Sequence, residues 1–219
     1  MAEHPRHADD LAARWARLIA AAGLGEAGML GDRLIAAYSE AHRRYHGLAH
    51  VRFLLNEIDR RASSLGNARL VAFAAWFHDA IYDPSAKDNE DRSAGWARRD
   101  LAVMGLPATQ CDAVARLILM TKSHHAGDAT PDEALFLDMD FAILGADHEV
   151  YTRYASGVRE EYAAVPDAAF RAGRAAFLKS VLGQSRMFRT DLYEEECGGR
   201  ARENMAREIE RLESGAPLI

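Results

Sequence analysis

The chain has 219 residues, of which 49% are hydrophobic and 27% are charged, and its formal net charge is −6. This length suffices for one large domain with a full hydrophobic core, and the composition is ordinary for a globular protein. The sequence contains no basic block and no run of 18 apolar residues, so it gives no support for nucleic-acid binding or a membrane-spanning helix.

Cysteine usage and the N-terminal segment bear on where the protein works. Cys111 and Cys197 form neither a CxxC metal motif nor a disulfide framework, which fits a reducing compartment but leaves a single bridge open. Residues 1–7 lack the apolar core of a signal peptide. We therefore expect a cytoplasmic protein without membrane or nucleic-acid partners, whose oligomeric state stays open.

Apolar residues recur at helical spacing from end to end, without convincing strand alternation. A first helix is predicted after an N-cap at Asp9 or Asp10, with Gly23 as its stop. Apolar positions in 30–38 mark a second helix. A third helix is predicted to begin near His46, because the apolar residues that follow, Val51, Leu54, Leu55 and Ile58, recur at helical spacing.

The fourth predicted helix, 67–82, is almost entirely apolar, as expected for a central helix. It should end before Pro84, because proline disfavours α geometry in the preceding residue. A fifth helix is predicted from Asp88 to about Met104, and a sixth runs toward His124.

The second half of the chain repeats this helical pattern after a loop at 126–131. The remaining helices are predicted at about 132–145, from Asp147, from Pro166 to about Gly183, and at 190–214 with an interruption at Gly198 and Gly199. No linker or repeat divides the chain. The prediction is an all-α fold, a single domain over 1–219 built from about nine or ten helices.

Three histidines, His42, His46 and His50, are spaced four apart, so in a continuous helix they would share one face. The last two invite comparison with the zinc-protease pattern HExxH. Position 47 is glycine, however, so the glutamate that acts as general base in that pattern is missing. Taken singly, each of these histidines is more simply explained as a hydrogen-bonded or exposed side chain.

The pair His78 and Asp79 closes the apolar run 71–77. A carboxylate at the end of a buried helix costs several kcal/mol unless it is paired or bound to a metal. The pair therefore suggests metal ligands. The structural alternative is that Asp79 pairs with an arginine while His78 donates to a backbone carbonyl.

Two further acids, Asp138 and Asp140, stand in an apolar helical run. They point about 200° apart on a helix, so only one of them can easily face an ion. Residues 121–125 contain Lys122, His124 and His125. This segment fits either a solvated helix C-terminus or a substrate-facing edge in which Lys122 meets a phosphate.

Together these residues resemble the HD superfamily of metal-dependent phosphohydrolases, in which a His, a His-Asp pair and a later Asp lie on a helical bundle. The closest resemblance is to the group described only as predicted HD phosphohydrolases. It covers most of the chain from about residue 40, through the segments 44–50 (RYHGLAH), 77–83 (FHDAIYD), 88–90 (DNE), 138–145 (DMDFAILG), 159–162 (REEY) and 201–204 (AREN).

The resemblance implies a divalent metal ion held by His50, His78, Asp79 and one later aspartate. Asp140 is the choice for this last ligand, from the order of the motif and its place before the apolar run 141–144. Two imidazoles and two carboxylates without a thiolate suit Mn, Fe, Co, Ni, Zn or Mg, and the sequence does not select among them.

The segment around His46 and His50 also looks like the corresponding stretch of cyclic nucleotide phosphodiesterases, which implies that His46 is a general acid and not a metal ligand. His124 or His125 could serve the same role, and Lys122, Arg43 or Arg44 could neutralise phosphate charge. Catalytic roles are therefore expected for His46, Lys122 and His124.

The expected function is hydrolysis of a phosphomonoester or nucleotide phosphoester by a metal-activated water. One alternative is a di-iron oxygenase of the same superfamily, with His124 or His125 as additional iron ligands. The other is a catalytically silent module that binds a nucleotide or a metal. The expected partner in the leading hypothesis is a small phosphorylated or nucleotide substrate.

Overall fold

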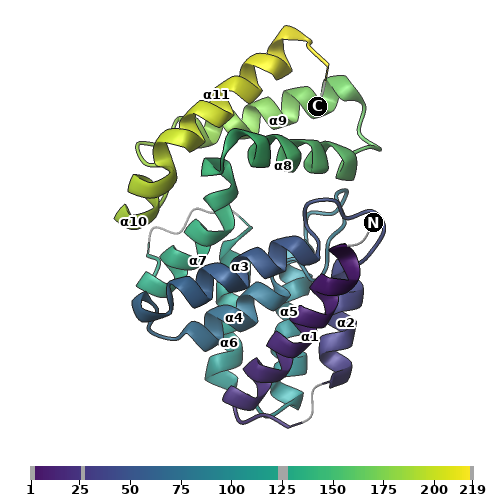
Figure 1. Cartoon of the computed structure of the whole chain (residues 1–219), viewed down its shortest axis with the longest axis vertical. Helices are drawn as coiled ribbons and strands as arrows, with labels where there is room; N and C mark the ends of the chain where they lie inside the picture. The colour runs from purple at the N-terminus through teal and green to yellow at the C-terminus, as the bar shows by residue number, and fades with distance from the viewer. Residues whose placement is uncertain (1–2, 26–27, 123–127, 218–219) are drawn as a thin grey trace. The chain divides into compact units, whose positions relative to one another are not determined.

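The computed structural model describes residues 3–25, 28–122 and 128–217. Every regular element in these residues is helical, so the all-α prediction is confirmed (Figure 1). The chain divides into two compact units, Met1–Phe136 and Leu137–Ile219, and the division falls inside helix α7. None of the helices in the described ranges is both long and apolar enough to cross a lipid bilayer.

The first unit contains all six helices predicted in the first half of the chain, together with a 3₁₀ turn and the start of the next helix. They are α1 (Glu3–Ala21), α2 (Gly28–Tyr38), α3 (Leu48–Arg60), the 3₁₀ turn η1 (Ala62–Ser64), α4 (Ala68–Phe77), α5 (Asn89–Val103), α6 (Ala108–Met120) and the first part of α7 (Pro131–Phe141).

Helix α4 forms the core of the first unit, as its apolar sequence predicts. It packs against α3, α5 and α6, and Phe73, Trp76 and Phe77 are fully buried. Trp15 of α1 meets all three of these rings edge-on, the closest being Trp76 with 5.3 Å between ring centroids. Burial of this aromatic cluster is a major apolar contribution to the stability of the unit.

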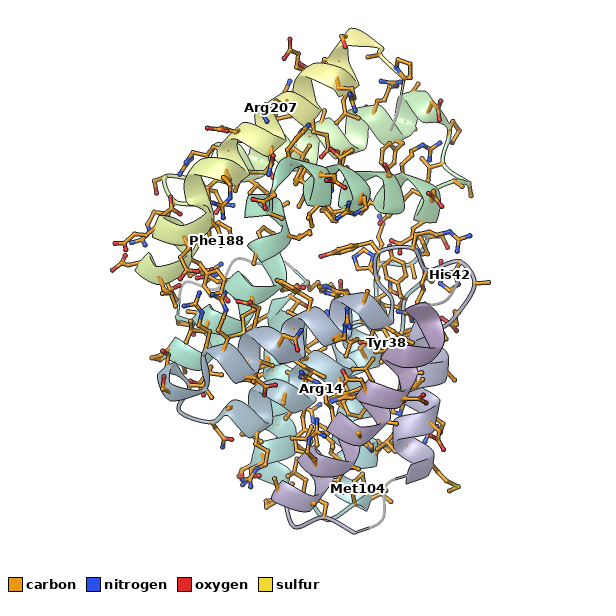
Figure 2. The ribbon with its side chains drawn as sticks, viewed as in Figure 1. Arg14, Tyr38, His42, Met104, Phe188 and Arg207 are labelled. Carbon is orange, nitrogen blue, oxygen red and sulfur yellow. The ribbon has the colours of Figure 1, made fainter. Side chains whose placement is uncertain are left out.

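Helix α1 is fixed to its neighbours by one close contact and one polar cluster. Gly31 of α2 lies so close to Trp15 that a Cβ atom there would be 2.4 Å from Cδ1 of the indole. Arg14, labelled in Figure 2, donates to Asn56 at 2.5 Å and to Asp59 at 3.0 Å, both on α3. Glycine is therefore required at position 31 for α2 to approach α1.

Several helix boundaries differ from the predictions. Helix α1 begins at Glu3, so Asp9 and Asp10 lie inside it and do not cap it; Pro5 falls in its first turn, where proline is tolerated. Helix α4 ends at Phe77 and not near residue 82. The carbonyls of the residues that follow Phe77 accept from a side chain of another segment, as described below, and the chain turns there.

The second unit follows the predicted pattern closely. Its elements are η2 (Ala142–Gly145), α8 (His148–Glu161), α9 (Asp167–Leu182), α10 (Asp191–Tyr193), the π-helical segment η3 (Glu194–Gly198) and α11 (Gly199–Ser214). Helices α8, α9 and α11 lie next to one another in Figure 1, and α11 contacts both α9 and η2.

The predicted interruption at Gly198 takes the form of the π-helical segment η3, and helix continues on both sides of it. A Cβ atom at Gly198 would meet the Glu194 carboxylate at 3.0 Å. Further along α11, the Asn204 amide donates to the carbonyls of Leu144 and Ala146 at 3.0 and 2.8 Å. These two bonds fix η2 against α11.

A buried polar cluster joins α8, α9 and α11 in the second unit. The Arg174 guanidinium pairs with the Glu208 carboxylate at 2.8 Å, and the Tyr151 hydroxyl donates to the same carboxylate. Burial of Tyr151, together with the adjacent negative charge of Glu208, raises the pKa of its hydroxyl. The three side chains satisfy one another, which is the condition for burying charge without a large penalty.

We expect Gly31→Ala to lower the free energy of unfolding by about 1–3 kcal/mol, because the added methyl must displace the Trp15 indole. Chemical denaturation measures this change. Gly28→Ala is the matched control, since a Cβ at Gly28 of the same helix meets nothing within 4 Å. Equal stability of the two variants would contradict a tight contact between α1 and α2.

Candidate metal centre

Two buried imidazoles and one carboxylate come together in the first unit. His50 lies in the first turn of α3, His78 caps α4, and Asp79 follows in the turn after α4. The Nε2 atoms of His50 and His78 are 3.1 Å apart, and Oδ2 of Asp79 lies 3.1 Å from Nε2 of His78 and 3.9 Å from Nε2 of His50. His50 is 4% exposed and His78 is 1% exposed.

The second nitrogen of His78 determines what its Nε2 atom can do. Nδ1 of His78 lies 3.1 Å from the Ala75 carbonyl oxygen, which can only accept, so Nδ1 carries the proton and donates. In the neutral imidazole, Nε2 is then an unprotonated lone pair directed at His50 and Asp79. A histidine that binds a metal uses its other nitrogen in the same way.

When His78 is neutral and Asp79 is ionised, Nε2 of His78 and Oδ2 of Asp79 face each other as two acceptors. Two lone pairs at 3.1 Å repel unless a positive charge lies between them, which requires either a proton or a metal cation. For donors about 2.1 Å from an ion, neighbouring ligands of an octahedron lie about 3.0 Å apart. The two separations of 3.1 Å fit that edge length, whereas the 3.9 Å between Nε2 of His50 and Oδ2 of Asp79 is longer. The three donors are thus close enough together to share one divalent metal ion.

The structural alternative for His78 and Asp79 was that His78 donates to a backbone carbonyl and that Asp79 pairs with an arginine. The structure shows part of this arrangement. His78 donates to a backbone carbonyl, as that alternative expects, but through Nδ1, which leaves Nε2 for the site. The arginine it expects is Arg43, which bonds to the backbone carbonyl of Asp79 at 2.6 Å. These contacts use Nδ1 of His78 and the backbone of Asp79, so they leave Nε2 of His78 and the Asp79 carboxylate available to bind a metal.

Arg43 is the principal support of the turn that follows α4. Its buried guanidinium donates to the carbonyls of Asp79, Ala80 and His46 at 2.6, 3.1 and 3.0 Å, and Nε pairs with Glu40 at 3.1 Å. These bonds join the segment before α3 to the turn after α4. The sequence suggested Arg43 only as a phosphate ligand. Its structural role in binding these backbone carbonyls could not be predicted from the spacing of residues.

Two more side chains hold the same turn from other helices. The Tyr38 hydroxyl at the end of α2 accepts from the Asp79 amide at 3.2 Å. The Ser93 hydroxyl on α5 accepts from the Ile81 amide at 3.1 Å and lies 3.4 Å from the Ile81 carbonyl. Neither residue stands out in the sequence, because each is a single polar group within an ordinary helical pattern.

The histidines before α3 do not share a helical face, because α3 begins only at Leu48. They are brought together by Tyr82 instead. The His46 ring stacks on the Tyr82 ring with 4.4 Å between centroids and lies 6.1 Å from the His50 ring. His42 is exposed and donates to the Tyr82 carbonyl at 3.0 Å. His46 is therefore a half-buried neighbour of a candidate ligand, whereas His42 is peripheral.

Asp138 has a structural role within the second unit. Its carboxylate is 2% exposed and accepts three hydrogen bonds of 2.7 Å, from the amides of Arg189 and Thr190 and from the Thr190 hydroxyl. Burial raises the pKa of Asp138, and the three donors partly offset this effect. Both carboxylate oxygens are engaged in tethering the segment before α10.

Asp140 follows two residues later on the same helix. Among the described residues, it forms with His50 and His78 a group of side chains that could hold a metal ion. Within the first unit, the Phe136 ring of α7 meets the His78 ring edge-on at 6.0 Å. Residue 140 is one helical turn after Phe136 and lies on the same face of α7, whereas residue 138 does not.

Two of the predicted phosphate ligands, Lys122 and Arg44, make contacts with other groups of the protein. The Lys122 ammonium pairs with the Asp91 carboxylate at 2.5 Å, and this hydrogen bond raises the pKa of Lys122. Arg44 is exposed and donates to the Ala41 carbonyl at 2.9 Å. His124 and His125 lie outside the residues that the structure describes.

Comparisons of the chain with protein-family models, with curated proteins and with solved structures found no match. The chemistry of the site therefore rests on its own residues. Those residues are a buried pair of imidazoles, an adjoining carboxylate and a turn held by three helices or segments outside it.

We expect Asp138→Asn to lower the free energy of unfolding by about 1–3 kcal/mol, because the amide that replaces one oxygen cannot accept from the donors of Arg189 and Thr190. Thermal or chemical denaturation measures the loss. Asp147→Asn is the control, since Asp147 is exposed and its side chain makes no capping bond to α8. A loss no larger than in this control would contradict the tethering role of Asp138.

Proposed function

We propose that the protein is a metal-dependent phosphohydrolase that acts on a phosphomonoester or a nucleotide phosphoester. The observation that carries this proposal is the pair of His78, which is buried, and Asp79, which is partly buried: Nε2 of His78 and Oδ2 of Asp79 lie 3.1 Å apart beside the buried imidazole of His50. The order of His50, His78–Asp79 and a later aspartate also resembles the HD superfamily of phosphohydrolases. The donor set contains imidazole and carboxylate without thiolate, which suits Mn, Fe, Co, Ni, Zn or Mg.

In this proposal His50, His78, Asp79 and Asp140 hold the ion. Asp140 is preferred to Asp138 for two reasons. It lies on the face of α7 whose Phe136 ring meets His78, and it belongs to the group of side chains that could hold a metal. The carboxylate of Asp138 is already engaged by three donors.

A bound divalent ion would lower the pKa of a water molecule and polarise the phosphoryl group of the substrate. The protein's own contribution is to fix the donors and to supply a proton. Tyr38 and Arg43 hold the backbone at Asp79, so its carboxylate is oriented before any ligand arrives. His46 is the proposed proton donor to the leaving oxygen, because its ring is half-buried and lies 6.1 Å from the His50 ring.

The first test is metal content. We expect the purified protein to contain a transition metal or Mg²⁺ in near-stoichiometric amount, and His50→Ala, His78→Ala and Asp79→Ala each to lose it, because each removes one ligand of four. Inductively coupled plasma mass spectrometry measures the metal, and a panel of phosphoesters measures turnover. Full metal retention in His78→Ala would contradict the site.

The two aspartates of α7 provide a matched pair within this test. Asp140→Asn keeps the shape of the side chain but removes the charge that favours a divalent ion, so metal affinity should fall more than in Asp138→Asn. Loss of a group that only supports a site typically costs about 10- to 100-fold in affinity. A larger loss for Asp138→Asn in metal titrations would reverse the assignment. Iron with oxygen consumption and no phosphoester turnover would point to an oxygenase instead.

His46→Ala should keep its metal and lose turnover by about 10²- to 10⁴-fold, because the proposed task of His46 is proton transfer. Steady-state kinetics together with metal analysis separates the two effects. His42→Ala is the matched control, since His42 also contacts Tyr82 but is exposed and bonds to its backbone carbonyl. A metal-free His46→Ala protein would instead make His46 a ligand.

A further inference from the structure

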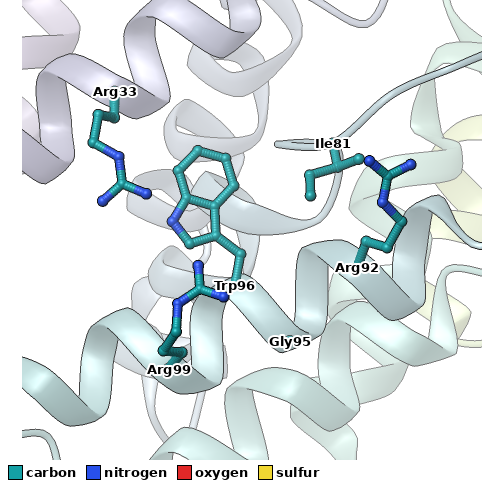
Figure 3. A pocket seen from close by; sticks show the side chains of 6 residues that line it. All are labelled: Arg33, Ile81, Arg92, Gly95, Trp96 and Arg99. Atoms are coloured by element: carbon teal, nitrogen blue, oxygen red, sulfur yellow. The ribbon is translucent and has the colours of Figure 1, made fainter.

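A cavity in the first unit adjoins the turn that carries His78 and Asp79, because Ile81 of that turn lines it. It is open to solvent, has a volume of about 530 Å³, and is lined by Arg33, Ile81, Arg92, Gly95, Trp96 and Arg99 (Figure 3). Arg33 comes from α2, Ile81 from the turn, and the other four from α5. None of the proposed metal ligands is among these lining residues.

The cavity concentrates positive charge on a protein whose net charge is −6. The residues that line it, all in the described part of the chain, include three arginines and no acid. Figure 3 shows the Trp96 indole between Arg33 and Arg99 on one side and Ile81 and Arg92 on the other. Guanidinium groups grouped in this way bind phosphate and carboxylate groups through paired N–H donors.

One carboxylate, Asp100, orders two of these arginines without neutralising both. It accepts from Nη1 of Arg33, from Nε of Arg99 and from the Trp96 indole, each at 2.8 Å. Although burial opposes ionisation, these hydrogen bonds lower the pKa of Asp100, so the carboxylate contributes one negative charge at neutral pH. The bonds use a single nitrogen of each guanidinium and leave the other N–H groups for a ligand.

The arginines are accessible as well as ordered. The side chains of Arg33, Arg92 and Arg99 are 56%, 50% and 65% exposed, so a ligand can reach them without first displacing protein. Arg92 has Asp88 as its ion-pair partner, at the long separation of 3.8 Å on an exposed helix face. Such a pair contributes little and yields readily to a multivalent anion.

The remaining lining residues give the cavity an apolar part and open space. Ile81 and the indole of Trp96 supply apolar surface, and a Cβ atom at Gly95 would meet nothing within 4 Å. A volume of about 530 Å³ lies within the range of sites for small molecules. The cavity can therefore hold a ligand that has both anionic groups and an apolar portion.

We propose that this cavity is a binding site for a small polyanion that carries two or more phosphate groups, separate from the metal centre. Two kinds of ligand have this chemistry, and in both a chain of phosphates would bind Arg33, Arg92 and Arg99. A nucleoside polyphosphate would add contacts between its base and the apolar surface of Ile81 and Trp96. An inorganic polyphosphate would use the arginines alone.

Isothermal titration calorimetry on the full chain tests the proposal with tripolyphosphate and with ATP as probes, each with and without a chelator. We expect both probes to bind in the presence of the chelator, and binding to weaken as salt is raised. Tighter binding of ATP would identify a nucleotide site, and equal binding would identify a polyphosphate site. Loss of all binding to His78→Ala protein would assign the anion to the metal centre and overturn the proposal.

Two sets of variants, one at arginines of α5 and one at Gly95, locate the site. Arg92→Ala and Arg99→Ala should each weaken binding by at least about tenfold, whereas Arg98→Ala should not, because Arg98 lies on the same helix but pairs with Asp112 outside the cavity. Gly95→Glu should abolish binding by adding a negative charge among the arginines.

Gly95→Ala is the control for Gly95→Glu, since it adds only a methyl group to open space and should bind as the parent protein does. Circular dichroism verifies that the variants are folded. The proposal is overturned if Gly95→Glu, folded as the parent is, binds tripolyphosphate as tightly, or if the parent protein binds neither probe.

Discussion

The buried guanidinium of Arg43 is the interaction on which the candidate metal centre depends. A chain that leaves a helix at Phe77 exposes carbonyl groups that the helix would have satisfied, and burying them unpaired would cost about 1–3 kcal/mol each. Arg43 satisfies the carbonyls of Asp79 and Ala80 and, with the same nitrogen that reaches Asp79, that of His46. The Arg43 guanidinium thus joins the turn that ends α4 to the segment that precedes α3.

This arrangement explains why His78 and Asp79 are consecutive. The α4 backbone positions His78 so that Nδ1 reaches the carbonyl three residues earlier, which directs Nε2 out of the helix end. The next residue has left the helix, so its carboxylate can return toward the same point, at 3.1 Å. In a continuous helix adjacent side chains diverge by about 100°, so leaving the helix after His78 makes it easier for the two donors to converge.

The sequence was a good guide to the helices, because they follow from local rules of periodicity. It also singled out His50, His78 and Asp79 by residue type, and the structure places these three side chains close together. It predicted that α4 would be central and that Asp138 and Asp140 would differ in role, since a two-residue spacing separates side chains on any helix. It could not predict the end of α4 at Phe77, because that boundary is set by Arg43, which is far away in the sequence. The stacking of His46 on Tyr82 and the hydroxyl of Tyr38 at Asp79 are equally long-range, and no local pattern encodes them.

The turn after α4 also connects two regions of opposite character. Its first residues, His78 and Asp79, present an imidazole nitrogen and a carboxylate, which suit a proton or a metal cation. Two residues later, Ile81 lines a cavity whose arginine side chains suit an anion. The Ser93 hydroxyl of α5 accepts a hydrogen bond from the Ile81 amide. The turn is held at Asp79 by Arg43 and Tyr38 and at Ile81 by Ser93. Because Ser93 belongs to the same helix as Arg92, Trp96 and Arg99, α5 both lines the cavity and supports the turn that carries the candidate ligands.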